Sequence, residues 1–306
     1  KNIVLIKKLK NQIVKMNLPN KQKGILALIG LAFTYASFGF FTRYLSVSFG
    51  FFQQLYLRIF AGLIIGFLIF GKSFDFSKLK KITTKEWLLL IFRASAYYLF
   101  GAALFNKSVL ITKISTVAFI GSLPMTAVLG FLILKEKVTK DKIFYIVLSF
   151  IGVVIISINS FSDFSFGQGE ILALMSCFFA ALSIVFRKYQ TKLLNNVEIT
   201  QIQLFIAFIF ILTASLLARE GWPINNWNIN VFLVILLSGL ANVLMIFFTN
   251  YGFEHVKTSI AANILTLEMF FAVLIGLIFY WEIPSLKEAF GGILILFSVI
   301  QMNKIE

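Results

Sequence analysis

The chain has 306 residues and a net charge of +15, yet apolar side chains dominate its composition. Hydrophobic residues make up 59% of it, charged residues only 13%, and the mean hydropathy is +0.91. A soluble domain is about a quarter charged, so this composition excludes an ordinary soluble protein. The apolar residues come in runs of roughly 20, the length a helix needs to cross the hydrocarbon core. The runs lack the alternation of a membrane β-barrel, and the sequence therefore predicts an all-α integral membrane protein.

Apolar runs between polar breaks predict ten transmembrane helices. Residues 1–23 precede the first of them and form a basic segment, either a helix lying on the inner leaflet or a frayed tail. The fifth and tenth predicted spans are short for a bilayer. The spans cover residues 24–45, 51–71, 87–106, 113–134, 143–160, 169–187, 198–218, 230–251, 258–280 and 288–302.

The lysines and arginines predict which way the spans point. An even number of spans places both termini on one side of the membrane. If that side is the cytoplasm, 21 Lys and Arg residues lie in cytoplasmic segments and 4 on the opposite side. This is the bias of the positive-inside rule. We therefore expect a multi-pass protein of a bacterial cytoplasmic (inner) membrane with both termini in the cytoplasm.

The chain contains a weak internal repeat. KISTVAFIGSLPMTAVLGFLILKEKV (113–138) aligns with KTSIAANILTLEMFFAVLIGLIFYWEI (257–283), which divides the chain into halves 24–160 and 161–306 with five spans each. Because five is odd, the second half enters the membrane from the opposite side. Inverted repeats of this kind let a central site open to either face in turn, although a duplication without a transport role is the alternative. The matched pairs are Lys113 and Lys257, Ser115 and Ser259, Gly130 and Gly276, and Glu136 and Glu282.

The two half-repeat endings resemble the EamA-type branch of the drug/metabolite transporter (DMT) superfamily. They read SLPMTAVLGFLILKEKVTKDKIFYIVLSFIGVVIIS and TLEMFFAVLIGLIFYWEIPSLKEAFGGILILFSVI, and Arg58 in YLRIFAGL lies where the family often has an arginine. The resemblance covers nearly the whole chain after residue 24. It implies a carrier of small metabolites driven by proton coupling or exchange; related proteins handle amino acids, amines, S-adenosylmethionine, purines and nucleotide sugars.

One departure from the family pattern concerns the ninth span. The family often has Leu-Glu-Pro where this chain has Leu267, Glu268 and Met269, whereas the first half keeps Pro124. A proline inside a helix frees a backbone carbonyl and permits a kink. We therefore expect the fourth span to bend by this means and the ninth not to, which puts exact symmetry in doubt.

Small and polar residues at helical spacing predict faces that line one central cavity. Packing between helices is the alternative for the serines, while an asparagine amide has four hydrogen-bonding positions to satisfy. Aromatic residues in the same region can stack on a ring-containing substrate or simply pack. The candidate cavity residues are Asn263, Asn242, Ser259, Thr266, Ser115, Phe119, Ser122, Thr34, Ser37, Tyr97 and Tyr98.

Three charged residues lie deep within predicted spans. An acid such as Glu268 near the midplane costs about 2.5–3.5 kcal/mol on insertion scales, so it is either a protonatable coupling site or an acid that holds the two halves together. On an ideal helix Glu268 lies about 140° from Asn263, so both face one cavity only if the helix unwinds locally. Arg58 and Arg93 can bind an anionic group or pair with an acid, whereas Arg43, near a span end, is expected to snorkel.

These observations predict a secondary active transporter of small organic metabolites (amino acids, amines or similar solutes) that works by alternating access. The alternatives are an uptake carrier such as an S-adenosylmethionine or nucleoside/nucleotide exchanger, a channel, and a membrane enzyme acting on a lipid-linked substrate. HExxH, GxSxG and P-loop patterns are absent from the sequence, so we do not expect an enzyme. We expect no cofactor, metal, nucleic acid or obligatory protein partner. The expected partners are a small-molecule substrate, the lipid bilayer and coupling protons, and the single cysteine, Cys177, is expected to pack.

Overall fold

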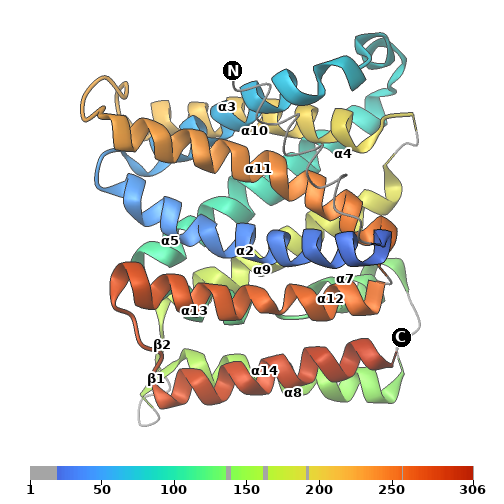
Figure 1. Cartoon of the computed structure of the whole chain (residues 1–306), viewed down its shortest axis with the longest axis vertical. Coiled ribbons are helices and arrows are strands. Elements are labelled where there is room, and N and C mark those ends of the chain that lie inside the picture. Colours follow the sequence, from blue (N-terminus) through green and yellow to red (C-terminus); the bar gives the residue numbers. More distant parts are fainter. Residues whose placement is uncertain (1–18, 136–138, 161–164, 191–192, 257, 306) are drawn as a thin grey trace.

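The computed structural model describes residues 19–135, 139–160, 165–190, 193–256 and 258–305, and these are almost entirely helical (Figure 1). The helices of the first half are α2 (Asn20–Ser46), α3 (Phe51–Phe70), α4 (Thr84–Ala94), α5 (Ala103–Ile111), α6 (Ile114–Gly121), α7 (Met125–Leu134) and α8 (Lys140–Ser157). Those of the second half are α9 (Gln168–Phe186), α10 (Asn196–Leu217), α11 (Ile229–His255), α12 (Thr258–Leu265), α13 (Leu267–Tyr280) and α14 (Leu286–Lys304). A short hairpin of β1 (Ile158–Ser160) and β2 (Ser165–Phe166) joins the halves.

Nine helical segments in the described part of the chain are long and apolar enough to cross a membrane. They match nine of the ten predicted spans. The remaining one, predicted at 143–160, is α8, whose 18 residues begin with Lys140, Asp141 and Lys142 and so leave a shorter apolar stretch. The third span is continuous from Thr84 to Ile111 and consists of α4, a π-helical segment (Ser95–Ala102) and α5.

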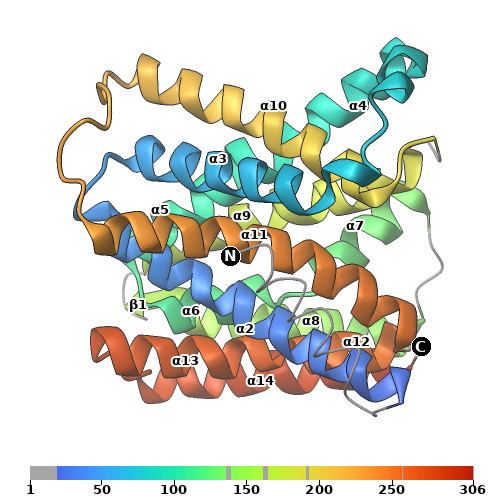
Figure 2. The same cartoon turned by 45° about the horizontal axis from the view of Figure 1, so that its top comes forward.

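The helices pack as an interleaved bundle in which the two halves alternate. α11 lies against both α2 and α3, α10 packs on α3, and α14 runs along α8. α10 and α14 lie at opposite edges of the molecule in both views (Figures 1 and 2). At Gly239 the backbones of α11 and α3 approach so closely that an added Cβ would lie 2.7 Å from the Cβ of Ala61 and 2.8 Å from the nitrogen of Gly62. Small residues permit such contacts between membrane helices.

The fourth and ninth spans are broken at equivalent places. α6 ends at Gly121 and α7 begins after Pro124. α12 and α13 are separated by Thr266, although this span has no proline. The absence of a proline therefore does not remove the symmetry between the two breaks. The Thr266 hydroxyl donates to the carbonyl of Asn263 at 2.7 Å and thereby satisfies an acceptor near the break. Both broken spans also end in a left-handed residue, Lys135 (φ 54°) and Trp281 (φ 55°).

Candidate functional site

A cavity of about 300 Å³ lies at the centre of the bundle. Its wall comes from both halves of the chain, with residues of α2, α3, α5, α6, α7, α9, α11 and α13. Two of its lining residues, Gly121 and Thr126, lie beside the α6–α7 break and are exposed. The polar and aromatic lining residues are Tyr35, Phe38, Arg58, Tyr97, Tyr98, Phe105, Asn106, Thr126, Ser176, Asn242 and Glu268.

A buried arginine forms one part of this wall. Arg58 is 4% exposed, and its Nη1 donates to Thr42 Oγ1 at 3.0 Å and to Asn106 Oδ1 at 2.9 Å. The Asn106 amide donates to the Ala102 carbonyl at 2.5 Å, which turns its oxygen toward the guanidinium. The ring of Phe38 lies 5.3 Å from the guanidinium carbon. The arginine is thus held by neutral groups, and no ion pair to it is found among the described residues.

Glu268 forms another part of the wall, at the start of α13 and next to the Thr266 break. Its carboxylate has no hydrogen bond or ion pair with any other residue that the structure describes. Tyr35, Tyr97 and Cys177 are close enough to interact with it electrostatically. The carboxylate therefore faces the cavity and not a partner helix.

Two of the aromatic lining residues lie on a distorted backbone. Tyr97 and Tyr98 belong to the π-helical segment Ser95–Ala102, which interrupts the third span at the depth of the cavity. π-helical turns are rare and occur frequently at functional sites. The tyrosine rings pack edge to face, with centroids 4.9 Å apart. Together with Tyr35 and Phe38 they make this part of the cavity aromatic.

The structure brings five of the sequence-predicted residues to the cavity: Arg58, Tyr97, Tyr98, Asn242 and Glu268. They come from two spans of the first half and two of the second. Asn242, on α11, donates its amide to the Ser238 carbonyl at 2.9 Å, which fixes the side chain within its own helix.

Most of the other candidates are not among the residues that line the cavity. Thr34, Ser37, Ser122 and Thr266 donate to backbone carbonyls three or four residues earlier. Ser115 is fully buried, and the ring of Phe119 lies against Gly292 of α14. Asn263 accepts a hydrogen bond from Asn303 at 3.0 Å and so links α12 to α14. Ser259 is helical, but its side chain lies outside what the structure describes.

Arg93 also lies away from the cavity. It is 5% exposed, its Nε donates to the Ser183 carbonyl at 3.0 Å, and its Nη1 donates to Gln190 at 2.8 Å. These contacts connect α4 to α9 and to the segment that follows it. The arginine is thus a packing and hydrogen-bonding residue between the halves.

The residues proposed from the sequence did not include several polar and aromatic residues of the cavity, among them Tyr35, Asn106 and Cys177. Asn106 was assigned only to the end of a span, although an amide in an apolar run is itself a signal of a buried polar contact. Cys177, which was expected to pack, does pack against apolar core residues, and its side chain also borders the cavity. The thiol shares this position with the neighbouring Ser176, one turn from Ala180.

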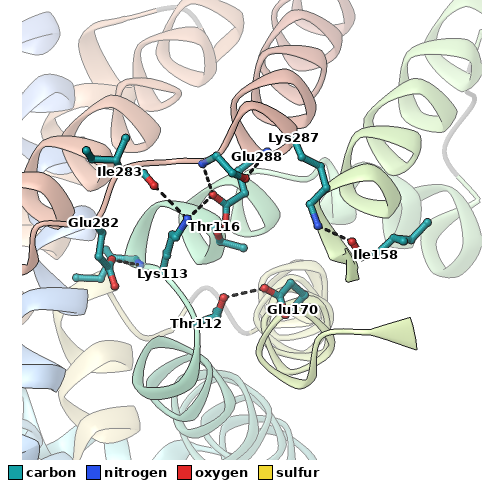
Figure 3. A network of polar contacts seen from close by, with 11 residues as sticks. Thr112, Lys113, Thr116, Ile158, Glu170, Glu282, Ile283, Lys287 and Glu288 are labelled. Carbon is teal, nitrogen blue, oxygen red and sulfur yellow. Dashed lines mark hydrogen bonds and ion pairs between the residues drawn. The ribbon is translucent and has the colours of Figure 1, made fainter. Parts of the chain in front are cut away.

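A network of polar contacts closes one end of the bundle (Figure 3). Lys113 forms an ion pair with Glu288 at 2.7 Å and donates to the Ile283 carbonyl at 3.0 Å. Thr116 donates to the same glutamate at 3.2 Å, and Thr112 donates to Glu170 at 2.7 Å. Each of these contacts joins the fourth span or the turn before it to the second half of the chain.

Arg43 belongs to the same network, contrary to the expectation that it snorkels. Its Nη1 forms an ion pair with Glu282 at 2.5 Å, and its other nitrogens donate to the Val109 and Thr112 carbonyls at 2.7 and 2.6 Å. Glu282 also accepts from the backbone N–H of Ile114 at 3.0 Å. Glu282 is distant from Arg43 in the sequence. It directly follows Trp281, the left-handed residue at the end of α13, and its carboxylate pairs with the guanidinium. The matching residue of the first half, Glu136, lies outside the described residues.

A family model matches both halves of the chain, and two curated relatives are named as transporters. The model of the "EamA-like transporter family" matches the chain twice, at residues 22–158 and 167–304. An uncharacterized transporter of Synechocystis sp. is 29% identical over 140 residues, which is 43% of this chain and 40% of the relative. An uncharacterized transporter of Archaeoglobus fulgidus is 27% identical over 177 residues, 58% of this chain and 55% of the relative. The alignments thus span about half the length of these relatives or less.

Several solved structures share the fold, and one of them is a crystal structure of a protein. It superposes with a TM-score of 0.61 over 92% of this chain and 97% of its own, at 10% sequence identity. At this identity the likeness concerns the architecture alone.

Proposed function

We propose that this chain, which belongs to the EamA-like transporter family and is a multi-pass membrane protein, is a secondary active carrier of small organic metabolites. In this proposal the central cavity is the substrate site, and it opens to the two sides of the membrane in turn. The two five-helix halves, 24–160 and 161–306, are the moving parts. The protein lies in a bacterial cytoplasmic membrane with both termini in the cytoplasm.

The observation that carries the proposal is the wall of the cavity. It is built from both halves, and it contains two charged side chains that lack ion-pair partners among the described residues. Charged groups inside membrane spans are costly and mark substrate or ion pathways. Broken helices that meet near the membrane midplane are typical of secondary transporters. A plain packing core would have buried apolar residues at these positions.

The polar network around Arg43 and Lys113 supports alternating access. It lies on the side that the charge distribution predicts to be outside, and it joins the two halves by ion pairs that a relative movement would break. We therefore assign this structure to a state closed on the outer side.

Glu268 is the residue proposed to couple transport to protons. A carboxylate that faces a cavity without an ion-pair partner can take up a proton in one state of the carrier and release it in the other. Exchange of solutes without net proton movement is the alternative mode, and it does not need this group.

The test is uptake into proteoliposomes of pooled labelled amino acids, amines, S-adenosylmethionine and nucleosides, with and without an imposed pH gradient. The proposal predicts saturable uptake of at least one pool that protein-free liposomes lack. Uptake that never saturates, or ionic current at channel rates, would remove the carrier from consideration. Lack of uptake of every pool in either direction would count against transport of these metabolites.

A further inference from the structure

The segment 71–85, which joins α3 to α4, forms a folded basic surface. We propose that this surface binds the headgroup of an anionic phospholipid on the side of the membrane that the charge distribution predicts to be cytoplasmic. The surface is separate from the central cavity, so the proposal is independent of the solute that the cavity carries. The basic residues of the segment are Lys72, Lys78, Lys80, Lys81 and Lys85.

Buried contacts fix the segment to the start of α10. A 3₁₀ helix (Phe76–Lys81) begins after Asp75, whose carboxylate accepts from the N–H of Ser77 at 2.9 Å. The ammonium of Lys78 lies 2.9 and 3.0 Å from the two carboxylate oxygens of Glu198, which is 0% exposed. The residues of the segment that pack in one apolar cluster with α4 and α10 are Phe74, Leu79 and Ile82. These contacts hold the backbone of the segment, so its exposed side chains form a defined surface.

Three lysines of this surface lack partners within the described structure. Lys72, Lys80 and Lys85 are exposed, and none of them has a hydrogen bond or ion pair with any residue that the structure describes. The acids beside them in the sequence, Asp75 and Glu86, accept hydrogen bonds from backbone N–H groups at the starts of helices. The three ammonium groups are therefore available to an external anion.

The surface lies at the boundary of the membrane. Lys72 is in the last turn of one span, and Lys85 is in the first turn of the next. The ring of Phe76 is 63% exposed and lies parallel to the ring of Phe67 in the last turn of α3, with centroids 6.5 Å apart. Aromatic rings at this depth contact the upper part of the acyl chains, and lysines extend from it to the headgroups. The segment thus presents an apolar ring beside unpaired cations.

An anionic phospholipid matches both features. Each lysine near an anionic membrane surface favours binding by a factor of about five. A zwitterionic headgroup carries its own cation beside the phosphate, so it gains less from the same lysines. A soluble polyanion would use the lysines alone, whereas the exposed ring of Phe76 favours a ligand that also has apolar chains. The lipid is therefore the partner that uses the whole surface.

The test is native mass spectrometry of the delipidated whole chain, titrated with phosphatidylglycerol or with phosphatidylcholine. We expect the parent protein to bind phosphatidylglycerol at least about fivefold more tightly than phosphatidylcholine. This preference should weaken at high ionic strength, which screens exposed charges. The combined variant Lys72→Gln, Lys80→Gln and Lys85→Gln should reduce the preference to less than about twofold.

A matched control removes the same charge from the same predicted side of the membrane. It combines Lys21→Gln, Lys140→Gln and Lys304→Gln, three lysines that are also exposed and have no ion pair among the described residues. The control should keep the preference of the parent protein, because these lysines lie on other segments. Glycerol 1-phosphate, which has the phosphate without the acyl chains, should not displace the bound lipid at an equal concentration.

The proposal is overturned if the parent protein binds the two lipids equally, or if the variant of the segment keeps the full preference. An equal loss in the control would assign the binding to diffuse positive charge and not to this surface. Displacement of the lipid by an equal concentration of glycerol 1-phosphate would assign the surface to a soluble phosphate compound, and it would likewise refute the lipid.

Discussion

Loss of the Arg43–Glu282 ion pair should open the outer side of the cavity. The substitution Glu282→Gln keeps the shape of the side chain and removes its charge. In the structure the pair joins α2 to the end of α13 at 2.5 Å, and the side chains are 15% and 17% exposed. The pair is therefore neither a surface contact nor a fully buried one.

The size of the effect follows from this partial burial. Exposed ion pairs contribute about 0.2–1 kcal/mol, and breaking a buried pair costs about 3–5 kcal/mol. We take an intermediate value of about 2 kcal/mol, which corresponds to a change of about 30-fold in an equilibrium between two states. If the pair exists only in the outward-closed state, the whole change favours opening.

The assay is the reaction of Cys177 with a membrane-impermeant thiol reagent added from outside to right-side-out vesicles. Glu282→Gln should increase the initial labelling rate by about 10- to 30-fold over the parent protein. Lys78→Gln is the control, because it breaks a comparable pair with Glu198 on the opposite face and should not increase labelling from outside. Unchanged labelling of Glu282→Gln, in a variant that remains folded, would refute the assignment of this network as the outer closure.

Three further predictions concern packing, capping and coupling. Gly239→Leu should lower the free energy of unfolding by about 1–3 kcal/mol, since the new side chain collides with α3. The control is Gly71→Ala, which should change that free energy by less than about 0.5 kcal/mol because nothing lies within 4 Å of the added Cβ. Equal melting temperatures of the two variants would contradict the packing argument. Glu220→Gln should cost about 1 kcal/mol, because its carboxylate accepts from the N–H groups of Phe52 and Gln53 at 2.9 Å; an unchanged thermal melt would show that the cap is dispensable. Glu268→Gln should abolish the pH-gradient dependence of uptake while leaving exchange intact; uptake that still follows the gradient would assign coupling to another group.

The hydropathy pattern predicted the helices well because membrane spans depend on local composition. Apolar runs and polar breaks placed nine of the spans, and α8 differed because charged residues occupy its first turn. The matched ends of the two half-repeats also appear in the structure as paired breaks and paired left-handed residues, Lys135 and Trp281. The break at Thr266 could not be predicted from the sequence, because no proline marks it. There the hydroxyl of Thr266 satisfies the carbonyl of Asn263.

The site was less predictable because it depends on contacts between distant segments. Arg58 and Glu268 were recognisable as costly charges within spans. The partners of the arginine were not, since Asn106 reaches it only when α3 and α5 are side by side. The sequence likewise does not reveal that Asn263 meets Asn303 whereas Asn242 faces the cavity. Helical spacing predicts a face, but the neighbouring helix decides what that face contacts.

The central claim is that solute crosses the membrane through the cavity that Cys177 borders. The most direct test is uptake of a transported solute into proteoliposomes before and after Cys177 is fully modified with a bulky maleimide, with Cys177→Ala as the unmodified control. The account predicts that modification abolishes uptake by the parent protein and leaves uptake by Cys177→Ala unchanged. Normal uptake by protein in which every Cys177 is modified would show that the solute takes another route.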